Sequence, residues 1–562
     1  MINVYIKELD INIEIEKGMN LYQAIEKAGI KIETPCGGKG VCGKCRVWVQ
    51  NSDKVPFTPH KDITKEEAAQ GLRLACQLVP EQDISVKLGE NFSYQQDTAP
   101  KGKILEAQKI FRDILDPAIE IISRNGDFKL KYDREADTSK PFSWESEYEP
   151  TGFAIDIGTT TIAVSLVSLK TGKILASDSS LNPQTALGHD VITRIQHAST
   201  PAGLKEMTKL VQNELNRLLD TTCRTLKFKK NEVIDVTIGG NTTMLQLAAG
   251  IDPSPLGVVP FKFDIIGGKS YPAKDFGLKV NNSARVYLPP VIHAYVGSDI
   301  SAGLLSCSDF FNDDKVIIYI DLGTNGEICL NARGRRYTTA TATGPAFEGM
   351  SISSGMRAEY GAIEHVEIVN SHFKFQTIGN SEIRGVCGSG IVDFIAALLK
   401  TGALDSSGKL LLNKDTDSPK QENKARVVQV NNKKSFLYGK GIYLTQKDIR
   451  QIQMAKGAIR SGIDIILKKG NISPDKIDKL YLAGGFGKYL NPYNMERIGI
   501  IPEHTAEKLV FIGNASIDGS ITLLTDVNQR YFLEKNLKTM EHLELANSPE
   551  FMDSFIKNLS FP

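Results

Sequence analysis

The chain has 562 residues, of which 41% are hydrophobic, and 67 basic and 66 acidic side chains give a formal net charge of +1. This length and apolar content predict a globular protein of several domains. The balanced charge favours neither nucleic acid nor an anionic membrane as a partner. No apolar run approaches the roughly 18 residues that a membrane span requires, so we expect no membrane association.

The first 30 residues predict a β-hairpin followed by a helix. Residues 2–6 and 11–15 alternate apolar and polar side chains, which is typical of two half-buried strands. Asn20 is the expected N-cap of a helix, and the following Leu21–Ala28 places apolar residues at helical spacing. Because this alternation lacks the continuous apolar core of a signal peptide, we read it as structure and not as an export signal.

A glycine-rich loop after this helix concentrates cysteines. Cys36, Cys42 and Cys45 have C-x5-C-x2-C spacing, and Cys76 follows after 30 intervening residues. Four thiolates are the ligands that a 2Fe-2S cluster requires, and glycines let backbone N–H groups approach the cluster sulfurs. A structural zinc site is the alternative, although zinc sites usually pair two short ligand elements. Residues 1–90 resemble vertebrate-type 2Fe-2S ferredoxins, which implies a β-grasp fold and these four cysteines as metal ligands.

The other four cysteines are scattered through apolar or small-residue surroundings: Cys223, Cys307, Cys329 and Cys387. We interpret them as free, buried thiols in a reducing compartment, and we therefore expect a cytoplasmic protein.

Residues 92–150 join this N-terminal region to the rest of the chain. Ile104–Ile122 has a helical pattern, and Asn125–Pro150 is rich in charged and hydroxyl side chains. The charged part cannot bury enough apolar area to fold alone, so we expect a linker or a small middle segment.

An internal repeat begins after residue 150. Phe153–Val164 and Ile317–Ile328 each contain an apolar strand, an Asp-x-Gly-Thr turn and a second strand. The glycine allows a phosphate to approach backbone N–H groups, and the aspartate can hold hydrated Mg²⁺ or an attacking water. One such turn can be an ordinary hairpin, but two favour phosphate binding. The candidate phosphate ligands are Gly158, Thr159, Thr160, Gly323, Thr324 and Asn325, and the candidate catalytic carboxylates are Asp156 and Asp321.

Each repeat continues in the same way. A helical stretch, residues 204–226 or 451–468, leads to a strand, residues 233–238 or 479–483, which ends in a pair of glycines. Glycines that close a strand leave a flat backbone surface on which adenine and ribose can lie. Glu327 is a further candidate for catalysis. Asp299 is a candidate Mg²⁺ ligand or, alternatively, an acid that favours the start of a helix.

These features resemble the superfamily of acetate and sugar kinases, Hsp70 and actin (ASKHA), which has a duplicated, ribonuclease H-like fold. The resemblance implies that residues 151–562 form an actin-like ATP-binding domain in two lobes. It also implies that Gly484, Gly485 and Gly487 form the adenosine motif. The expected fold class is therefore α/β multidomain, with a ferredoxin domain at residues 1–91, a joining segment at 92–150 and the ATPase domain beyond.

A ferredoxin fused ahead of an actin-like ATPase, together with the segments Thr343–Gly349 and Gly361–Glu364, resembles the reductive activators of corrinoid proteins. The resemblance implies ATP-dependent delivery of one electron from a 2Fe-2S cluster, which converts inactive Co(II) to Co(I). It implies ATP, Mg²⁺ and the cluster as cofactors. The implied partners are a corrinoid protein of a methyltransferase system, a low-potential electron donor and a second copy of the chain in a homodimer.

Two other functions are compatible with the same motifs, because a fold does not by itself define a reaction. One is a small-molecule kinase with a redox-regulatory ferredoxin domain, and the other is a non-catalytic, nucleotide-gated redox sensor. The hydroxyl-rich segments Thr338–Thr343 and Ser351–Ser354 are candidates for contact with a corrinoid partner or, alternatively, part of the nucleotide site only. The eight histidines show no paired metal-ligand spacing, and we interpret them as structural.

Overall fold

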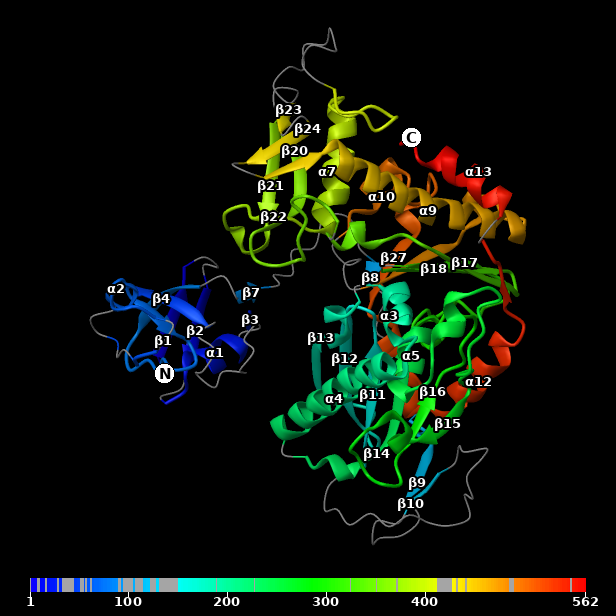
Figure 1. Ribbon diagram of the computed structural model, residues 1–562, viewed down its shortest axis with the longest axis horizontal. Coiled ribbons are helices and arrows are strands. Elements are labelled where there is room, and N and C mark those ends of the chain that lie inside the picture. The colour runs from blue at the N-terminus through cyan, green and yellow to red at the C-terminus, as the bar shows by residue number, and fades with distance from the viewer. Residues whose placement is uncertain are drawn as a thin grey trace.

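The computed structural model describes the following residues: 2–7, 11–15, 18–27, 30–32, 45–50, 55, 58–60, 63–88, 92–94, 105–106, 115–121, 128–130, 150–188, 190–226, 228–323, 325–349, 351–369, 372–411, 427–430, 433–439, 442–484, 490–545 and 548–562. A small N-terminal domain lies beside a larger body that is built on two sheets (Figure 1). Among the described residues, no helix has the length and apolar character needed to cross a membrane.

The N-terminal domain is a five-stranded sheet in the order β2-β1-β6-β4-β5 with a helix packed on it. Its elements are β1 (Ile2–Ile6), β2 (Ile11–Ile15), α1 (Leu21–Lys27), β4 (Arg46–Gln50), α2 (Lys65–Ala69), β5 (Leu72–Leu74) and β6 (Ile84–Leu88), with a separate ribbon of β3 (Ile30–Ile32) and β7 (Phe92–Tyr94). The predicted hairpin is confirmed, because β1 and β2 pair antiparallel. The helix prediction is also confirmed, since the Asn20 side chain accepts a hydrogen bond from the Gln23 N–H at 2.9 Å.

The first sheet of the body has the order β13-β12-β11-β14-β16-β15. Its strands are β11 (Thr151–Ile157), β12 (Thr161–Ser168), β13 (Ile174–Leu181), β14 (Val233–Gly240), β15 (Lys269–Pro272) and β16 (Arg285–Leu288). The helices of this region are α3 (Val191–Ala198), α4 (Pro201–Thr225), α5 (Thr242–Ala249) and α6 (Ser298–Leu305).

The second sheet has the order β28-β19-β18-β17-β26-β27-β8. Its strands are β17 (Val316–Leu322), β18 (Gly326–Ala332), β19 (Arg335–Thr341), β26 (Lys479–Ala483), β27 (Leu509–Gly513), β28 (Glu541–His542) and β8 (Leu105–Glu106). Its helices are α7 (Gly388–Thr401), α9 (Gln446–Gly470), α10 (Pro492–Ile498), α11 (Ala515–Thr525), α12 (Val527–Leu537) and α13 (Pro549–Asn558). Two small sheets complete this part of the body. One consists of β20 (Ala362–Val369), β21 (His372–Thr377) and β22 (Gly385–Val386), and the other of β23 (Val427–Val430), β24 (Lys433–Gly439) and β25 (Ile442–Thr445).

The repeat seen in the sequence is also a structural repeat. In the first sheet β11 pairs antiparallel with β12 and parallel with β14, and in the second β17 pairs antiparallel with β18 and parallel with β26. Both central strands are buried along nearly their whole length, which explains their continuous apolar runs. The duplicated α/β fold expected from the sequence is thus confirmed.

The helix predicted at Ile104–Ile122 is wrong in the residues that the structure describes. Leu105–Glu106 forms β8, which pairs parallel with β27, and β9 (Ile119–Ile121) pairs antiparallel with β10 (Phe128–Leu130). Between them, the Asp116 N–H donates to the Thr525 carbonyl at 2.9 Å. Backbone hydrogen bonds to a distant partner, β27, and to a nearby one, β10, override the local helical pattern here.

The C-terminal helices return to the first sheet. Helix α11 packs against β11 and β14, although it follows the strands of the second sheet in the chain. Arg530 on α12 forms an ion pair with Asp235 on β14, and both side chains are 1% exposed. The two sheets are therefore joined by packing as well as by the chain.

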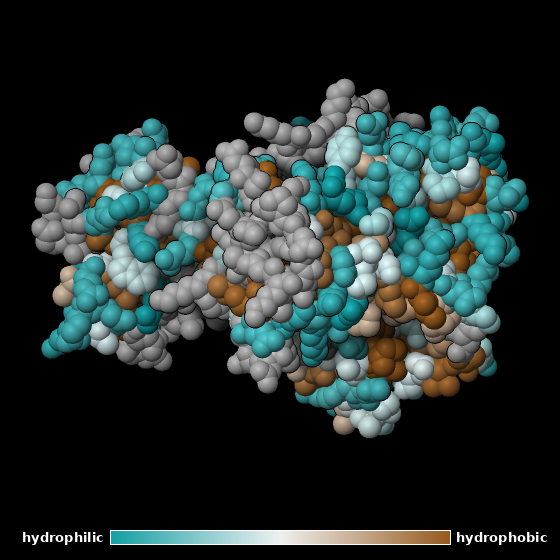
Figure 2. All heavy atoms as spheres, turned by 90° about the horizontal axis from the view of Figure 1, so that it is seen from above, coloured by the Kyte–Doolittle hydropathy of each residue, from teal (hydrophilic) through white to brown (hydrophobic). Residues whose placement is uncertain are grey.

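The N-terminal domain contacts the body through Tyr360, whose side chain packs against the domain's apolar core. Seen from above in Figure 2, the residues drawn in colour are mostly hydrophilic on this face, and hydrophobic side chains show only in separate small areas between them.

Candidate functional site

Carboxylates gather where the two central strands end. Asp156 lies near the end of β11 and Asp321 near the end of β17, so the duplication places them at matching positions. Glu327 on β18 is the cross-strand partner of Asp321. Asp299 lies in the first turn of α6, where its Oδ1 accepts a hydrogen bond from the Ile300 N–H at 2.9 Å. The structure therefore brings together all four predicted carboxylates.

The mutual repulsion of these groups is visible in their pKa values. Burial, followed by the charges of Asp156 and Asp321, raises the pKa of Asp299 to about 8. Burial and the charge of Asp156 raise the pKa of Asp321 to about 6. Burial, with Asp299 and Asp321 nearby, also raises the pKa of Glu327 well above its ordinary value. Buried like charges disfavour ionisation in this way unless a cation compensates them.

The first Asp-x-Gly-Thr turn is held from several sides. The Gly158 N–H donates to the Thr161 carbonyl at 3.0 Å, and the Gly158 carbonyl accepts from the Asn182 side chain at 2.9 Å. Arg194, which is fully buried, donates to the Thr159 carbonyl at 2.6 Å. A Cβ at Gly158 would lie 2.7 Å from the Thr161 carbonyl oxygen, so the turn requires glycine there.

The second turn has a similar frame. The Gly323 N–H donates to the Asn325 carbonyl at 2.9 Å, and the Thr343 hydroxyl donates to the Gly323 carbonyl at 3.0 Å. Thr324 lies outside the described residues. The two turns face a shared region, since the Thr160 hydroxyl of the first turn lies 3.5 Å from Glu348, which follows the second hairpin in the chain.

The hydroxyl-rich segment next to this hairpin holds the sheet together. Thr338, Thr339 and Thr341 are buried and donate to the carbonyls of Ile328, Leu543 and Gly326 at 3.2, 2.8 and 3.2 Å. These three hydroxyls therefore have internal acceptors, and contact of residues 338–343 and 351–354 with a corrinoid partner stays a prediction beside the alternative that they belong to the nucleotide site only.

Gly484, a residue of the predicted adenosine motif, directly follows β26 and lies beside Asp321. Its φ of +108° is accessible to glycine, and a Cβ would lie 2.7 Å from the Leu322 carbonyl oxygen and 3.7 Å from Asp321 Oδ1. The backbone of this residue therefore lies directly against the strand that carries Asp321. Gly485 and Gly487 lie outside the described residues.

Two residues that the sequence analysis missed hold Asp156 in place. The Asn514 side chain donates to one carboxylate oxygen at 2.9 Å, and the Ser516 hydroxyl donates to the other at 2.8 Å. Both lie at the start of α11, and no motif in the sequence connects this helix to Asp156. Similarly, the Tyr319 hydroxyl donates to Asp321 at 3.2 Å from two residues earlier on β17.

In the N-terminal domain, two of the four predicted cluster ligands lie side by side. Cys45 directly precedes β4 and Cys76 closely follows β5, and these strands pair antiparallel with Arg46 opposite Leu74. Their sulfur atoms are consequently 3.2 Å apart. Cys36 and Cys42 lie outside the described residues. Cys223, Cys307, Cys329 and Cys387 are buried free thiols, which confirms that part of the prediction.

The described residues fit the cofactors that the motifs imply. Two adjacent thiols at the ends of neighbouring strands offer the sulfur ligands that iron–sulfur clusters take. In the body, no lysine or arginine is among the described groups that shift the pKa values of the four carboxyls, so an oxygen-liganded divalent cation would offset their charge.

Three family descriptions match successive parts of the chain. The 2Fe-2S iron-sulfur cluster binding domain matches residues 4–81, the RACo middle region residues 151–309, and the C-terminal domain of RACo, the ASKHA domain, residues 315–562. The chain is therefore a 2Fe-2S ferredoxin fused to an ASKHA-type, ATP-binding body. The middle region begins at residue 151, where β11 starts, so it coincides with the first sheet.

Similar proteins identify the family. The chain is 32% identical over 426 residues to the corrinoid activation enzyme RamQ of Eubacterium limosum, an alignment that covers 74% of this chain and 71% of that protein. It is 25% identical over 441 residues to the Co(II) methylated amine-specific corrinoid protein reductase of Methanosarcina barkeri, covering 73% and 77%. A solved structure, a reductive activator for corrinoid,iron-sulfur protein, matches 100% of this chain and 98% of its own, with a TM-score of 0.71 and 30% identity. The chain belongs to the family of reductive activators of corrinoid proteins.

Proposed function

We propose that this chain reduces the cobalt of a corrinoid protein from Co(II) to Co(I), with one electron from the 2Fe-2S cluster of its N-terminal domain and with ATP bound to its body. The observation that carries this proposal is the presence, in one chain, of adjacent cluster cysteines and of two facing phosphate turns lined with carboxylates. We assign residues 1–91 to the electron-transfer domain, 92–150 to the joining segment and 151–562 to the two-lobed ATP-binding domain.

We assign the nucleotide contacts to residues from both sheets. The backbone N–H groups and hydroxyls of both turns receive the phosphates, and the glycines that follow β26 receive adenosine. The residues proposed for this role are Gly158, Thr159, Thr160, Gly323, Thr324, Asn325, Gly484, Gly485 and Gly487. This assignment is supported at the first turn, where a Cβ at position 158 would lie 2.7 Å from the Thr161 carbonyl oxygen and only glycine fits.

The four carboxylates have separate proposed roles. Asp156 and Asp299 hold Mg²⁺, and Asp321 and Glu327 orient the attacking water and take its proton. The pKa of Asp321, which burial and the charge of Asp156 raise to about 6, supports a role for this group in proton transfer, because a general base works best when its pKa lies near the working pH. Asn514 and Ser516 keep the Asp156 carboxylate in position.

When bound, the cluster supplies one electron at low potential and MgATP supplies the free energy of hydrolysis. Each ~59 mV by which a one-electron transfer runs uphill costs about 1.4 kcal/mol. The two sheets meet at the carboxylates, so a nucleotide bound there favours one arrangement of the sheets over another. Such a shift in conformation is how nucleotide binding acts on the bound partner. One electron leaves the cluster for each cobalt that is reduced, so a low-potential external donor must reduce it again.

The test is ATP hydrolysis by the full-length, cluster-loaded protein under anaerobic conditions, with and without a Co(II) corrinoid protein and a reductant. We expect the corrinoid protein to stimulate hydrolysis and the Co(I) absorption band to appear only when ATP is present. If several corrinoid proteins give neither result, the small-molecule kinase and the redox sensor become the better functions, and a screen for phosphate acceptors separates those two.

Two variants separate the halves of this reaction. Asp321→Ala should abolish ATP hydrolysis and leave the visible spectrum of the cluster intact, whereas Cys42→Ala should abolish that spectrum. Asp314→Ala is the matched control for Asp321→Ala, because Asp314 is an exposed aspartate just before the same strand. Full hydrolysis by Asp321→Ala would contradict the assignment of Asp321, and an unchanged spectrum in Cys42→Ala would contradict the ligand set.

We also propose that the protein works in the cytoplasm. The free, buried cysteines of the body support this proposal, because unpaired thiols persist in a reducing compartment.

A further inference from the structure

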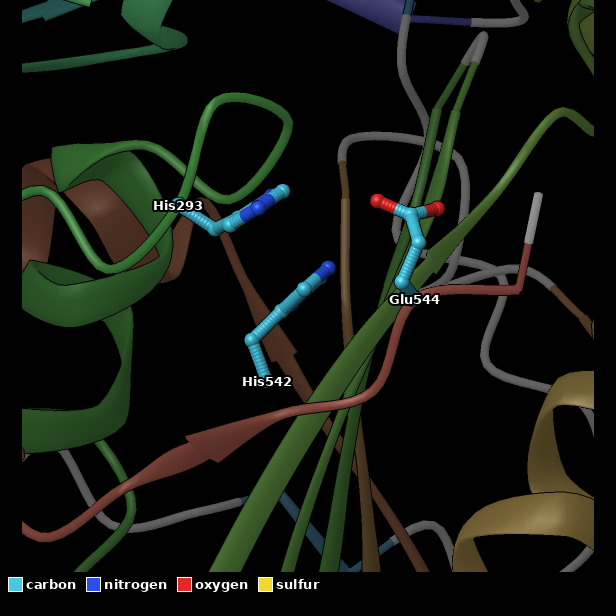
Figure 3. A group of neighbouring side chains, drawn as sticks. All are labelled: His293, His542 and Glu544. Atoms are coloured by element: carbon cyan, nitrogen blue, oxygen red, sulfur yellow. The ribbon is translucent and has the colours of Figure 1, made fainter. Parts of the chain in front are cut away.

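Two histidines that lie 249 positions apart in the sequence stack on each other beside a glutamate. The imidazoles of His293 and His542 are nearly parallel, with ring centroids 3.7 Å apart and an interplanar angle of 11°. One ring nitrogen of each histidine and one carboxylate oxygen of Glu544 all lie within 4.8 Å of one another. In Figure 3 both rings extend toward the side on which Glu544 lies.

Hydrogen bonds hold the backbone around both histidines in place. His293 lies in a tight turn after β16, where its N–H donates to the Val296 carbonyl at 3.1 Å and its carbonyl accepts from the Thr242 hydroxyl at 3.1 Å. His542 lies on β28, which pairs with β19 opposite Thr338, and the next N–H donates to the Thr338 carbonyl at 2.7 Å. Strand β28 ends at His542, and Glu544 follows two residues later with a carboxylate oxygen within 4.8 Å of the ring nitrogens. Preorganised ligands of this kind reduce the cost of binding an ion.

The histidines lack the partners that buried imidazoles normally have. In the described part of the chain, the Nδ1 atoms of His293 and His542 are buried without a hydrogen-bond partner. Stacked rings so close together also repel each other when charged: burial and then the charge of His293 lower the pKa of His542 to about 3. Burial also lowers the pKa of His293, although Glu544 opposes this effect. Burial therefore disfavours the charged form of both rings, and neutral imidazole is the form that binds metal ions.

We propose that His293, His542 and Glu544 form a binding site for a divalent metal ion of the zinc class. Two imidazole nitrogens and one carboxylate oxygen are a ligand set that Zn²⁺ takes, with a water in the remaining position. Ligand atoms on one zinc ion lie roughly 3.5 Å apart, so small side-chain rotations bring these three into range. Glu544 is exposed, which gives the ion a path from solvent.

The site joins the two sheets of the body at a functional position. His293 belongs to the turn that leads, through Val296, into α6 and the carboxylate of Asp299, whereas His542 and Glu544 belong to the edge of the second sheet. An ion held here fixes the start of α6 against β28. This site uses none of the residues assigned to the cluster or to the nucleotide, so its existence does not depend on the proposed function.

The test measures Zn²⁺ binding to the full-length protein with its 2Fe-2S cluster assembled, so that the cluster cysteines are not free to take zinc. Excess Mg²⁺ in the buffer occupies the oxygen-only carboxylate site. Zinc is titrated in competition with a fluorescent zinc chelator, and bound zinc per chain is counted by elemental analysis. We expect one zinc site in the unaltered chain, and a higher melting temperature of the body when zinc is bound.

Single substitutions test whether these three residues form the zinc site. His293→Ala and His542→Ala should each weaken the tightest zinc binding at least ~100-fold, and Glu544→Gln about 10-fold, because even groups that only support ligands contribute 10–100-fold. His372→Ala, which changes an exposed histidine on β21 that is not part of the proposed site, is the control and should bind zinc as the unaltered chain does. Where a histidine variant fails to fold, Glu544→Lys tests the site instead, since this exposed position tolerates a charge and a cation there repels the metal. Zinc binding that is absent from the unaltered chain, or equal in the unaltered chain and in His542→Ala or Glu544→Lys, would overturn the proposal.

Discussion

The buried ion pair between Arg530 and Asp235 should be essential for attaching the C-terminal helices to the first sheet. The Arg530 Nη2 donates to Asp235 Oδ2 at 2.6 Å, and its Nε donates to the Leu523 carbonyl at 2.8 Å. The guanidinium carbon also lies 4.5 Å from the ring centroid of Tyr287. We therefore expect Arg530→Met to leave the Asp235 carboxylate buried without its ion-pair partner, with only the more weakly acting Arg285 nearby.

The expected size of the effect follows from the burial of the pair. Both side chains are 1% exposed, so solvent does not screen the charge that is left behind. Loss of one partner of a buried pair costs about 3–5 kcal/mol. For a body of about 410 residues, an unfolding entropy of about 2.1 cal/mol/K per residue means that each kcal/mol lowers the melting temperature by about 1.2 °C, so the calorimetric transition of the body should move down by about 3–6 °C.

The experiment includes an internal reference and a test of whether loss of the ion pair causes the lower melting temperature. The N-terminal domain has a separate apolar core, so bleaching of the cluster absorbance should occur at an unchanged temperature. The double variant Asp235→Asn with Arg530→Met removes both charges and should lose less stability than the sum of the single variants. A body transition within about 2 °C of the unaltered protein in Arg530→Met, or an additive double variant, would refute the reasoning.

Three further predictions concern Gly484, Lys456 and Ser516. Gly484→Ala should weaken ATP binding in a nucleotide titration and destabilise the body by about 1–3 kcal/mol, because a Cβ there meets the Leu322 carbonyl oxygen. Gly402→Ala is the control. Its φ is also positive, at +68°, but its Cβ would meet nothing within 4 Å, so ATP binding should stay unchanged. Burial, with Arg460 nearby, lowers the pKa of Lys456 from 10.5 to about 8. Because the unfolded chain then binds the extra proton between these pH values, the unaltered protein should gain about 3 kcal/mol relative to Lys456→Met as the pH rises from 8 to 10.5. Melting curves of both proteins across this range check the sign, and a constant difference would contradict it. Ser516→Ala removes a buried hydrogen bond to a carboxylate, which contributes about 1.5–3 kcal/mol. It should therefore lower kcat/KM for ATP hydrolysis about tenfold and lower the melting temperature of the body by only about 2–3 °C. Full activity would mean that Asn514 alone holds Asp156.

Local patterns determined much of the fold. Alternating apolar side chains predicted the hairpin β1–β2, because side chains on successive strand residues point to opposite faces. Apolar strands on either side of an Asp-x-Gly-Thr turn predicted the hairpins β11–β12 and β17–β18. Helical spacing predicted α4 and α9, and the repeated Asp-x-Gly-Thr turns predicted a duplicated body with Asp156 and Asp321 at matching strand ends. Signals of this kind lie within a few residues of each other, so they can be read before the chain is folded.

Other features depend on residues that only the tertiary structure brings together. Leu105–Glu106 is a strand because β27 offers it an edge, although its own neighbourhood has a helical pattern. Ser516 holds Asp156, Arg530 neutralises Asp235, and His293 stacks on His542, each across more than 200 positions of sequence. The sequence alone determined the chemistry available at each position and the two folds that carry it. The tertiary structure decided which of those side chains meet, because contacts between distant segments depend on sheet order and helix packing and leave no periodic signal in the chain.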